Sequence, residues 1–238
     1  MLRLIAFFSY FVGFLIYSIP TLSKMKKIDP TVPAAKRDAI IHKIPQRWSS
    51  TIMKITGSKI IVEGKENLPD GPVVIVCNHV GDFDIPVLLS SIDKPFGFIS
   101  KIEVSKVPVL SDWMRVMNCV FLDRADRRQA IKTIKAAIET VKSGHSLVLF
   151  PEGTRSKGGP IGEFKTGGFR IAMDGQVPIV PIAIIGTADV FEKNNYLVRP
   201  ATITLKIAKP IDSHLVEQMS IKDLAEETKQ VILAHLPK

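Results

Sequence analysis

The sequence places a histidine and an aspartate at a spacing that suits general-base catalysis. His79 and Asp84 stand five residues apart, in the polar segment that follows the apolar run 73–77. Five residues of a regular helix would turn the two side chains about 140° apart, so they can meet only across a non-helical turn. Gly81 offers the conformational freedom for such a turn. In that arrangement Asp84 would orient the imidazole and make His79 a competent base.

Neither a covalent nucleophile nor a metal site is indicated. The sequence contains no G-x-S-x-G segment, and Cys77 and Cys119 lie in apolar runs typical of strand interiors. Two cysteines are too few for a disulfide scaffold, which favours a reducing cytoplasmic setting. The five histidines lack the spacing of zinc ligands. A base without its own nucleophile indicates that the substrate provides the attacking oxygen. The spacing alone also leaves open an alternative to the catalytic pair, in which His79 is a loop histidine and Asp84 is a solvated aspartate.

A second polar turn follows the apolar run 146–150. It contains, in order, Glu152, Gly153, Thr154 and Arg155. An arginine beside exposed backbone N–H groups and a hydroxyl suits a phosphate, whereas the alternative is a surface turn with a solvated arginine. Arg124 directly follows Asp123 at the end of another apolar run and adds a second cation.

The elements that must position these turns alternate along the chain. Short β-branched runs predict strands at 59–63, 73–77, 96–100, 119–122, 146–150, 179–185 and 202–208. Helical periodicity appears between and after them, most clearly at 125–143 and 220–236. We therefore predict an α/β fold, a mixed central sheet flanked by helices. Sites in such sheets gather at strand ends. Two prolines within 177–182 predict an irregular strand, an edge strand or one that lines a groove.

The N-terminal quarter combines an apolar segment with clustered positive charge. Residues 4–19 carry no charged side chain and would form a helix about 24 Å long, slightly short of a hydrocarbon core of about 30 Å. Residues 1–59 contain ten Lys or Arg against two Asp, so +8 of the net charge of +9 lies there. No zinc-finger spacing or RNP-like pattern accompanies this charge, which therefore indicates phospholipid and not nucleic acid.

We predict that this apolar segment is a retained membrane anchor. A cleaved signal peptide is the alternative, but no small-residue cleavage site follows the segment. Three lysines, Lys24, Lys26 and Lys27, would lie among lipid headgroups and favour the cytoplasmic face of the cell membrane.

A second N-terminal segment, 36–56, alternates isoleucines with basic residues at helical spacing. An interfacial helix is favoured over a core-packing one, and Pro45 is expected to kink or restart it. The chain is thus divided into membrane-anchoring helices, 1–58, and an α/β domain, 59–238, whose core is expected to begin near Lys59.

Four blocks in a fixed order carry a family resemblance. They are Asn78-His79-x4-Asp84, Phe121-Leu-Asp-Arg124, Phe150-Pro-Glu-Gly-Thr-Arg155 and Val177-Pro-Ile-Val-Pro181. Together they resemble the glycerophospholipid acyltransferase family, most closely its 1-acylglycerol-3-phosphate acyltransferases, from about residue 59 to 185. Asn118 stands where the family commonly has glycine, so the backbone geometry at that position is open.

The resemblance implies transfer of an acyl group from acyl-CoA or acyl carrier protein to the sn-2 hydroxyl of lysophosphatidic acid, giving phosphatidic acid. It implies no bound cofactor and no metal. His79 would be the general base and Asp84 would orient it, without an acyl-enzyme. An apolar groove should accept the acyl chain, and the acceptor phosphate should meet Arg155 with help from Lys101 and Arg124. The expected substrate-binding residues are Lys101, Arg124, Glu152, Gly153, Thr154 and Arg155, of which Glu152 is expected to shape the loop.

Two alternatives remain within this resemblance. The acceptor could be glycerol 3-phosphate or another lysophospholipid, although the Phe-Leu-Asp-Arg and Pro-Glu-Gly-Thr-Arg-Ser blocks resemble the lysophosphatidate group more. A non-catalytic lipid-binding relative is the other alternative, and the presence of both His79 and Asp84 argues against it.

Overall fold

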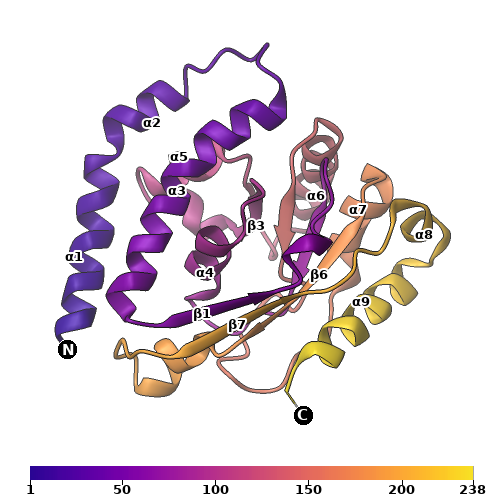
Figure 1. Cartoon of the computed structure of the whole chain (residues 1–238). Helices are drawn as coiled ribbons and strands as arrows, with labels where there is room; N and C mark the ends of the chain where they lie inside the picture. Colours follow the sequence, from indigo (N-terminus) through magenta and orange to yellow (C-terminus); the bar gives the residue numbers. More distant parts are fainter. Residues whose placement is uncertain (238) are drawn as a thin grey trace.

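Seven strands form one sheet in the order β1-β7-β6-β2-β5-β3-β4 in the computed structural model, which describes residues 1–237 (Figure 1). The strands are β1 (Lys59–Glu63), β2 (Val74–Cys77), β3 (Gly97–Lys101), β4 (Val120–Leu122), β5 (Leu147–Leu149), β6 (Ile179–Ile185) and β7 (Thr202–Ile207). Five neighbouring pairs are parallel, and β6 and β7 are antiparallel. The predicted strand runs and the mixed sheet are confirmed.

Helices cover both faces of this sheet (Figure 1). They are α1 (Leu2–Tyr17), α2 (Ile19–Met25), α3 (Ala34–Thr56), α4 (Asp84–Ser91), α5 (Leu110–Val116), α6 (Arg127–Lys142), α7 (Arg170–Gly175), α8 (Ser213–Gln218) and α9 (Ile221–His235). The central strand β2 shows why both faces are apolar. Its side chains alternate between two cores: Ile75 and Cys77 pack with residues of α2 to α5, and Val74 and Val76 pack with residues of α6, α7 and α9.

The proline-containing strand β6 lies inside the sheet, between β2 and β7. The expectation that it lies at an edge is therefore wrong, whereas the expectation that it lines a groove stays a prediction. Pro181 accepts a backbone hydrogen bond from Ala208 on the β7 side, and the ladder with β7 begins only at Ile182. Pro181 has no N–H with which to return this bond to Ala208, so the pairing with β7 is incomplete at the proline and becomes regular from Ile182 onward.

The N-terminal helices contribute to the main core, which corrects the expectation that the core begins near Lys59. Leu22 of α2 and Ile41 and Ile52 of α3 are buried with residues of β2, α4 and β6. Core packing, the alternative to an interfacial helix, therefore describes the apolar face of α3. The helix does not restart at Pro45, because packing along α4 offsets the hydrogen bond that proline cannot make. The division of the chain at residue 58 remains a prediction.

Helix α1 is apolar on two opposite sides. One side packs against the core through Leu4, Phe7, Phe11 and Leu15, and the other exposes Leu2, Ile5, Phe8, Val12 and Ile16. No single helix among residues 1–237 has the length and apolar character to cross a bilayer, but α1 and α2 pass that test together, with a bend of 50° between them. Ser18 at the bend accepts a hydrogen bond from the Trp113 indole at 2.8 Å, which ties the bend to α5.

Candidate active site

The predicted histidine and aspartate meet across the turn that joins β2 to α4. His79 Nδ1 lies 2.7 Å from Asp84 Oδ2, and the same oxygen accepts the backbone N–H groups of Val80 at 2.7 Å and Gly81 at 3.1 Å. Asp84 is fully buried at the first position of α4, where the helix dipole favours a carboxylate. Its other oxygen, Oδ1, accepts the hydroxyl of Thr187. A carboxylate surrounded by donors fixes the tautomer in which His79 Nδ1 carries the proton.

The remaining nitrogen of His79, Nε2, is therefore the basic one. It has no hydrogen-bond partner among residues 1–237, and the ring is 20% exposed and lines a cavity. The imidazole stacks on Phe150, with the ring centroids 4.2 Å apart. The ring is thus held on one side by Asp84 and on one face by Phe150, while Nε2 is available to a bound hydroxyl.

The structure does not show the use of Gly81 that the sequence predicted. Its backbone does not adopt the left-handed conformation that favours glycine. Instead, a Cβ at this position would lie 2.7 to 2.9 Å from the carboxylate of Glu192. A larger residue at position 81 would therefore require the Glu192 carboxylate to move, whereas the backbone conformation itself would accept it.

The loop after β5 is hydrogen-bonded to the backbone of His79. Both oxygens of Glu152 accept backbone N–H groups, from His79 at 2.6 Å and from Gly162 at 2.7 Å. Ser156 N–H donates to the carbonyl of His79 at 2.8 Å, so the two loops are joined directly. Glu152 is buried and both of its carboxylate oxygens accept backbone N–H groups, which is consistent with the expected effect on the loop; its place among the substrate-binding residues stays a prediction.

The other five expected substrate-binding residues surround one opening. Lys101, Arg124, Gly153, Thr154 and Arg155 all line the same cavity as His79. Arg124 donates to the carbonyl of Gly153, and Arg155 pairs with the exposed carboxylate of Asp82. The sequence did not indicate Lys157, which also lines this opening. The mouth of the cavity is therefore cationic, which suits a phosphate.

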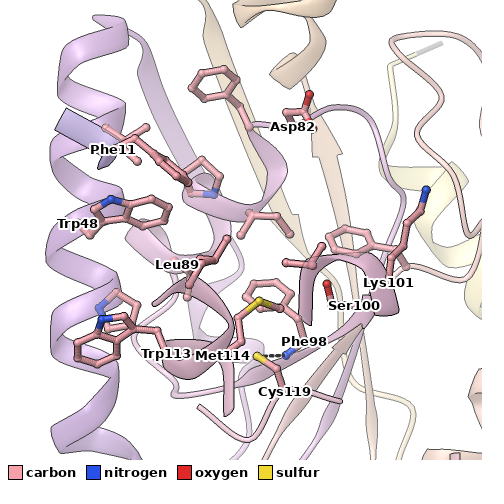
Figure 2. A pocket seen from close by; sticks show the side chains of 18 of the residues that line it. Phe11, Trp48, Asp82, Leu89, Phe98, Ser100, Lys101, Trp113, Met114 and Cys119 are labelled. Atoms are coloured by element: carbon pink, nitrogen blue, oxygen red, sulfur yellow. Dashed lines mark hydrogen bonds between the residues drawn. The ribbon is translucent and has the colours of Figure 1, made fainter. Parts of the chain in front are cut away.

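Behind this mouth the cavity is apolar and has a volume of about 790 Å³. Figure 2 shows its wall between α3, α4 and α5, with Trp48, Leu89, Phe98, Trp113 and Met114 turned toward it. Helix α1 closes one side mainly with Phe7, Phe11, Phe14 and Leu15. The sequence predicted α1 as an anchor but not as a wall of the site. A space of this size and lining suits a long acyl chain.

Both cysteines are buried in this region. Cys119 lines the cavity and its sulfur accepts the N–H of Phe98 at 3.2 Å, whereas Cys77 is enclosed in β2. Burial raises the pKa of Cys119 to about 12 and that of Cys77 well above its usual value. Neither thiol is suited to nucleophilic catalysis. Within residues 1–237, no three His, Cys, Asp or Glu side chains gather to hold a metal ion.

A second His–Asp pair lies at the opposite end of the sheet, and the sequence did not indicate it. His145 precedes β5, and its Nδ1 lies 2.6 Å from Oδ2 of Asp38 on α3. Its Nε2 lies 3.3 Å from the guanidinium of Arg37. Asn118, where glycine was expected, has a φ of 60° and donates to Asp38 at 3.2 Å. Asparagine tolerates this left-handed conformation, which resolves the geometry that the sequence left open.

Comparison with known proteins agrees with this geometry. The family model described as "Acyltransferase" matches residues 59–185. The chain is 39% identical over 173 residues to a chloroplastic 1-acyl-sn-glycerol-3-phosphate acyltransferase of Arabidopsis thaliana, covering 71% of this chain and 48% of that protein. It is 32% identical over 202 residues to a probable 1-acyl-sn-glycerol-3-phosphate acyltransferase of Mycoplasma pneumoniae, covering 83% of this chain and 74% of that one.

A solved structure shares the fold over nearly the whole chain. The crystal structure of the 1-acyl-sn-glycerophosphate acyltransferase from Thermotoga maritima is similar with a TM-score of 0.82 at 27% identity, covering 98% of this chain and 94% of that one. The chain spans about half the length of the Arabidopsis protein. The matched segment includes both halves of the His79–Asp84 pair and the loop that carries Arg155. The chain therefore belongs to the acyltransferase family.

Proposed function

We propose that this protein transfers an acyl group from acyl-CoA or acyl carrier protein to the sn-2 hydroxyl of 1-acylglycerol 3-phosphate, forming phosphatidic acid. The observation that carries this proposal is the position of His79. Its ring lies in one cavity with a cationic mouth and an apolar interior. The cationic mouth suits the phosphate of such an acceptor, His79 suits its hydroxyl, and the apolar interior suits its acyl chain. The two relatives and the Thermotoga structure carry names that denote this acceptor class.

The reaction needs one base and no enzyme nucleophile. Nε2 of His79 takes the proton of the acceptor hydroxyl while that oxygen attacks the thioester carbonyl carbon. The new C–O bond forms, the C–S bond breaks, and the thiol leaves with the proton that His79 returns. Asp84 stabilises the imidazolium that exists between these steps.

The cations at the mouth bind the acceptor phosphate in this proposal. Arg155 offers a planar fork of donors, and Lys101 and Arg124 line the same opening. Arg155→Ala is expected to raise the KM for the acceptor with a smaller change in the KM for the donor. Arg155→Lys should rescue only in part, because a point charge replaces a bidentate donor. A rise in the donor KM alone would assign Arg155 to the other substrate.

The same proposal places the protein at the cytoplasmic face of a membrane. The outer side of α1 exposes a continuous apolar stripe, of the kind that marks a membrane or protein contact. Lys24, Lys26 and Lys27 are exposed at the end of α2, where anionic headgroups would attract them. Both the acceptor and the product reside in the bilayer, so an enzyme with this stripe meets its substrate there.

The activity is tested with purified protein and vesicles that contain lysophosphatidic acid. Radiolabelled palmitoyl-CoA and palmitoyl-acyl carrier protein are offered separately, and the lipid product is identified by chromatography and mass spectrometry. Glycerol 3-phosphate and lysophosphatidylcholine serve as competing acceptors. Phosphatidic acid should be the main product with at least one donor. Lysophosphatidate binding without any acyl transfer would indicate a lipid-binding relative and contradict the proposal.

Membrane contact needs its own test, because deletion of α1 would also remove a wall of the cavity. The double substitution Ile5→Ser with Val12→Ser changes only exposed side chains of the stripe. Ile131→Ser, at an exposed isoleucine of α6, is the matched control. The double variant should float less with vesicles in high salt, and the control should float like the parent protein, since salt does not screen apolar insertion. Equal flotation of all three would place the contact elsewhere.

A further inference from the structure

A buried carboxylate lies beneath the turn that carries the catalytic pair. Glu192 belongs to a short 3₁₀ helix, Glu192–Asn194, in the chain segment that follows β6. Its side chain is 2% exposed, and Oε1 accepts the backbone N–H of Asp82 at 2.7 Å. The carboxylate also fills the space beside Gly81 where a Cβ would otherwise be. Glu192 thus contacts the middle of the turn between His79 and Asp84.

The same carboxylate faces the arginine at the mouth of the cavity. Arg155 has two acidic neighbours, and they differ in their access to solvent. Asp82, which contacts the guanidinium directly, has a side chain that is 52% exposed, whereas Glu192 lies 3.9 Å away and is buried. A phosphate that enters the mouth competes with Asp82 for Arg155, since both are anions that seek the same donors. The exposed carboxylate can rotate into water, but the buried one stays in place.

Burial of Glu192 is costly for the fold. Its Oε2 has no hydrogen-bond partner in the described chain. Burial raises the pKa of the carboxyl group, and the hydrogen bond from Asp82 N–H and, to a smaller extent, the charge of Arg155 oppose that rise. A buried charge is tolerated when an opposite charge is close, and Arg155 supplies it here. The charge of Glu192 and the position of Arg155 are therefore linked.

We propose that Glu192 is a positioning residue that acts on both halves of the site. Its hydrogen bond holds the turn of His79 and Asp84 at Asp82 N–H. Its charge keeps Arg155 at the mouth after the acceptor phosphate has displaced Asp82. This inference rests on the proposed function, because it assigns Arg155 to a phosphate that competes with Asp82.

The two roles are separated by two substitutions. Glu192→Gln keeps an oxygen for Asp82 N–H and removes the charge, so the acceptor KM should rise about tenfold with kcat within about twofold of the parent. Glu192→Ala removes both, so kcat should also fall, by about tenfold or more. Glu227→Gln, at an exposed glutamate of α9, is the control and should match the parent. An unchanged acceptor KM in Glu192→Gln overturns the role of the charge.

A double-variant cycle tests the link to Arg155 directly. In an Arg155→Ala background, Glu192→Gln should add little to the acceptor KM, because the group it positions is gone. A further tenfold rise there would show that Glu192 acts independently of Arg155. Such a result overturns the proposal even when the wild-type protein makes phosphatidic acid.

Amide hydrogen exchange gives a readout that does not depend on turnover. The Asp82 amide should exchange at least about tenfold faster in Glu192→Ala than in the parent, and near the parental rate in Glu192→Gln. Thermal unfolding of each variant checks that the fold is intact. If the Asp82 amide exchanges at the parental rate in folded Glu192→Ala, the proposal that Glu192 positions the turn is wrong. Absence of phosphatidic acid from the wild-type reaction would instead contradict the proposed function.

Discussion

The two His–Asp pairs have nearly the same internal geometry and opposite surroundings. Nδ1 lies 2.7 Å from the carboxylate in the His79–Asp84 pair and 2.6 Å in the His145–Asp38 pair. The difference is at the far nitrogen of each ring. His79 lines the cavity and its Nε2 has no hydrogen-bond partner in the described part of the chain, whereas Nε2 of His145 lies 3.3 Å from the guanidinium of Arg37. In the proposed mechanism, only the His79 ring can therefore act as a base, because its other nitrogen is accessible to substrate.

The largest expected difference is in turnover. His79→Ala should lower kcat by ~10²–10⁴-fold with the fold preserved, because the general base is lost. His145→Ala should retain kcat within about threefold and lose stability instead, because Asp38 and Arg37 lose a buried partner. Steady-state transfer assays and urea unfolding of both variants make the test. Comparable turnover in the two variants would erase the distinction between the pairs.

The aspartates should differ in the same direction with a smaller effect. Asp84→Asn no longer imposes the productive tautomer on His79, and kcat should fall by about 10²-fold. Asp38→Asn should leave kcat close to the parental value and lower the free energy of unfolding by about 1–3 kcal/mol. Turnover is compared at saturating acceptor, so that binding defects do not contribute. A severe loss of kcat in folded Asp38→Asn would mean that this region acts on the site.

Acid should destabilise the region of Asp38 through its neighbour His42. Burial lowers the pKa of His42 to about 4, against 6.5 for the free side chain, although Asp38 and Asp93 oppose this shift. Between pH 6.5 and 4, His42 is therefore protonated in the unfolded chain but neutral in the folded chain. The contribution of His42 to stability is complete above pH 6.5 and is lost as the pH drops toward 4, by about 3 kcal/mol in total. Urea unfolding of wild type and His42→Gln across this range should show a shallower loss in the variant; parallel curves would contradict the assignment.

The smallest expected effect concerns the backbone beside Asp38. Asn118 adopts a φ of 60° and donates to Asp38, so Asn118→Gly loses only the side-chain contact. Asn118→Ala also places a poorly suited residue in a left-handed conformation and should be about 1 kcal/mol less stable than the glycine variant. Chemical denaturation resolves this difference. Turnover of both variants should match the parent, and an alanine variant as stable as the glycine one would show that the conformation relaxes.

The sequence predicted best those features that depend on residues close together in the chain. β-Branched runs between polar turns identified all seven strands, and the spacing of His79 and Asp84 identified a pair that one turn can bring together. The order of the sheet could not be predicted in the same way. Strand β2 lies between β5 and β6, with Val74 opposite Leu147 and Ile179, and such distant pairings leave no local pattern.

The residues that support the turn from His79 to Asp84 were missed for the same reason. Thr187 and Glu192 reach Asp84 and Asp82 from more than a hundred residues away, and neither stands in a recognisable pattern. Residues 4–19 predicted a helix correctly, but their apolar character fits a bilayer and a cavity wall equally well. Only the structure shows that one side of α1 packs against the core while the opposite side is exposed.

The labelling rates of the two buried thiols also report on motions of the protein. Cys77 and Cys119 are the only cysteines of the chain, and a thiol reagent reacts only with an exposed thiolate. Cys77 sits in the central strand, so its modification requires the sheet to come apart. Cys119 lines the cavity, so a separation of α1 or α5 from the sheet is enough to expose it. The ratio of the two labelling rates therefore distinguishes local opening of the cavity from global unfolding. A bound acyl chain should slow the labelling of Cys119 and leave that of Cys77 unchanged.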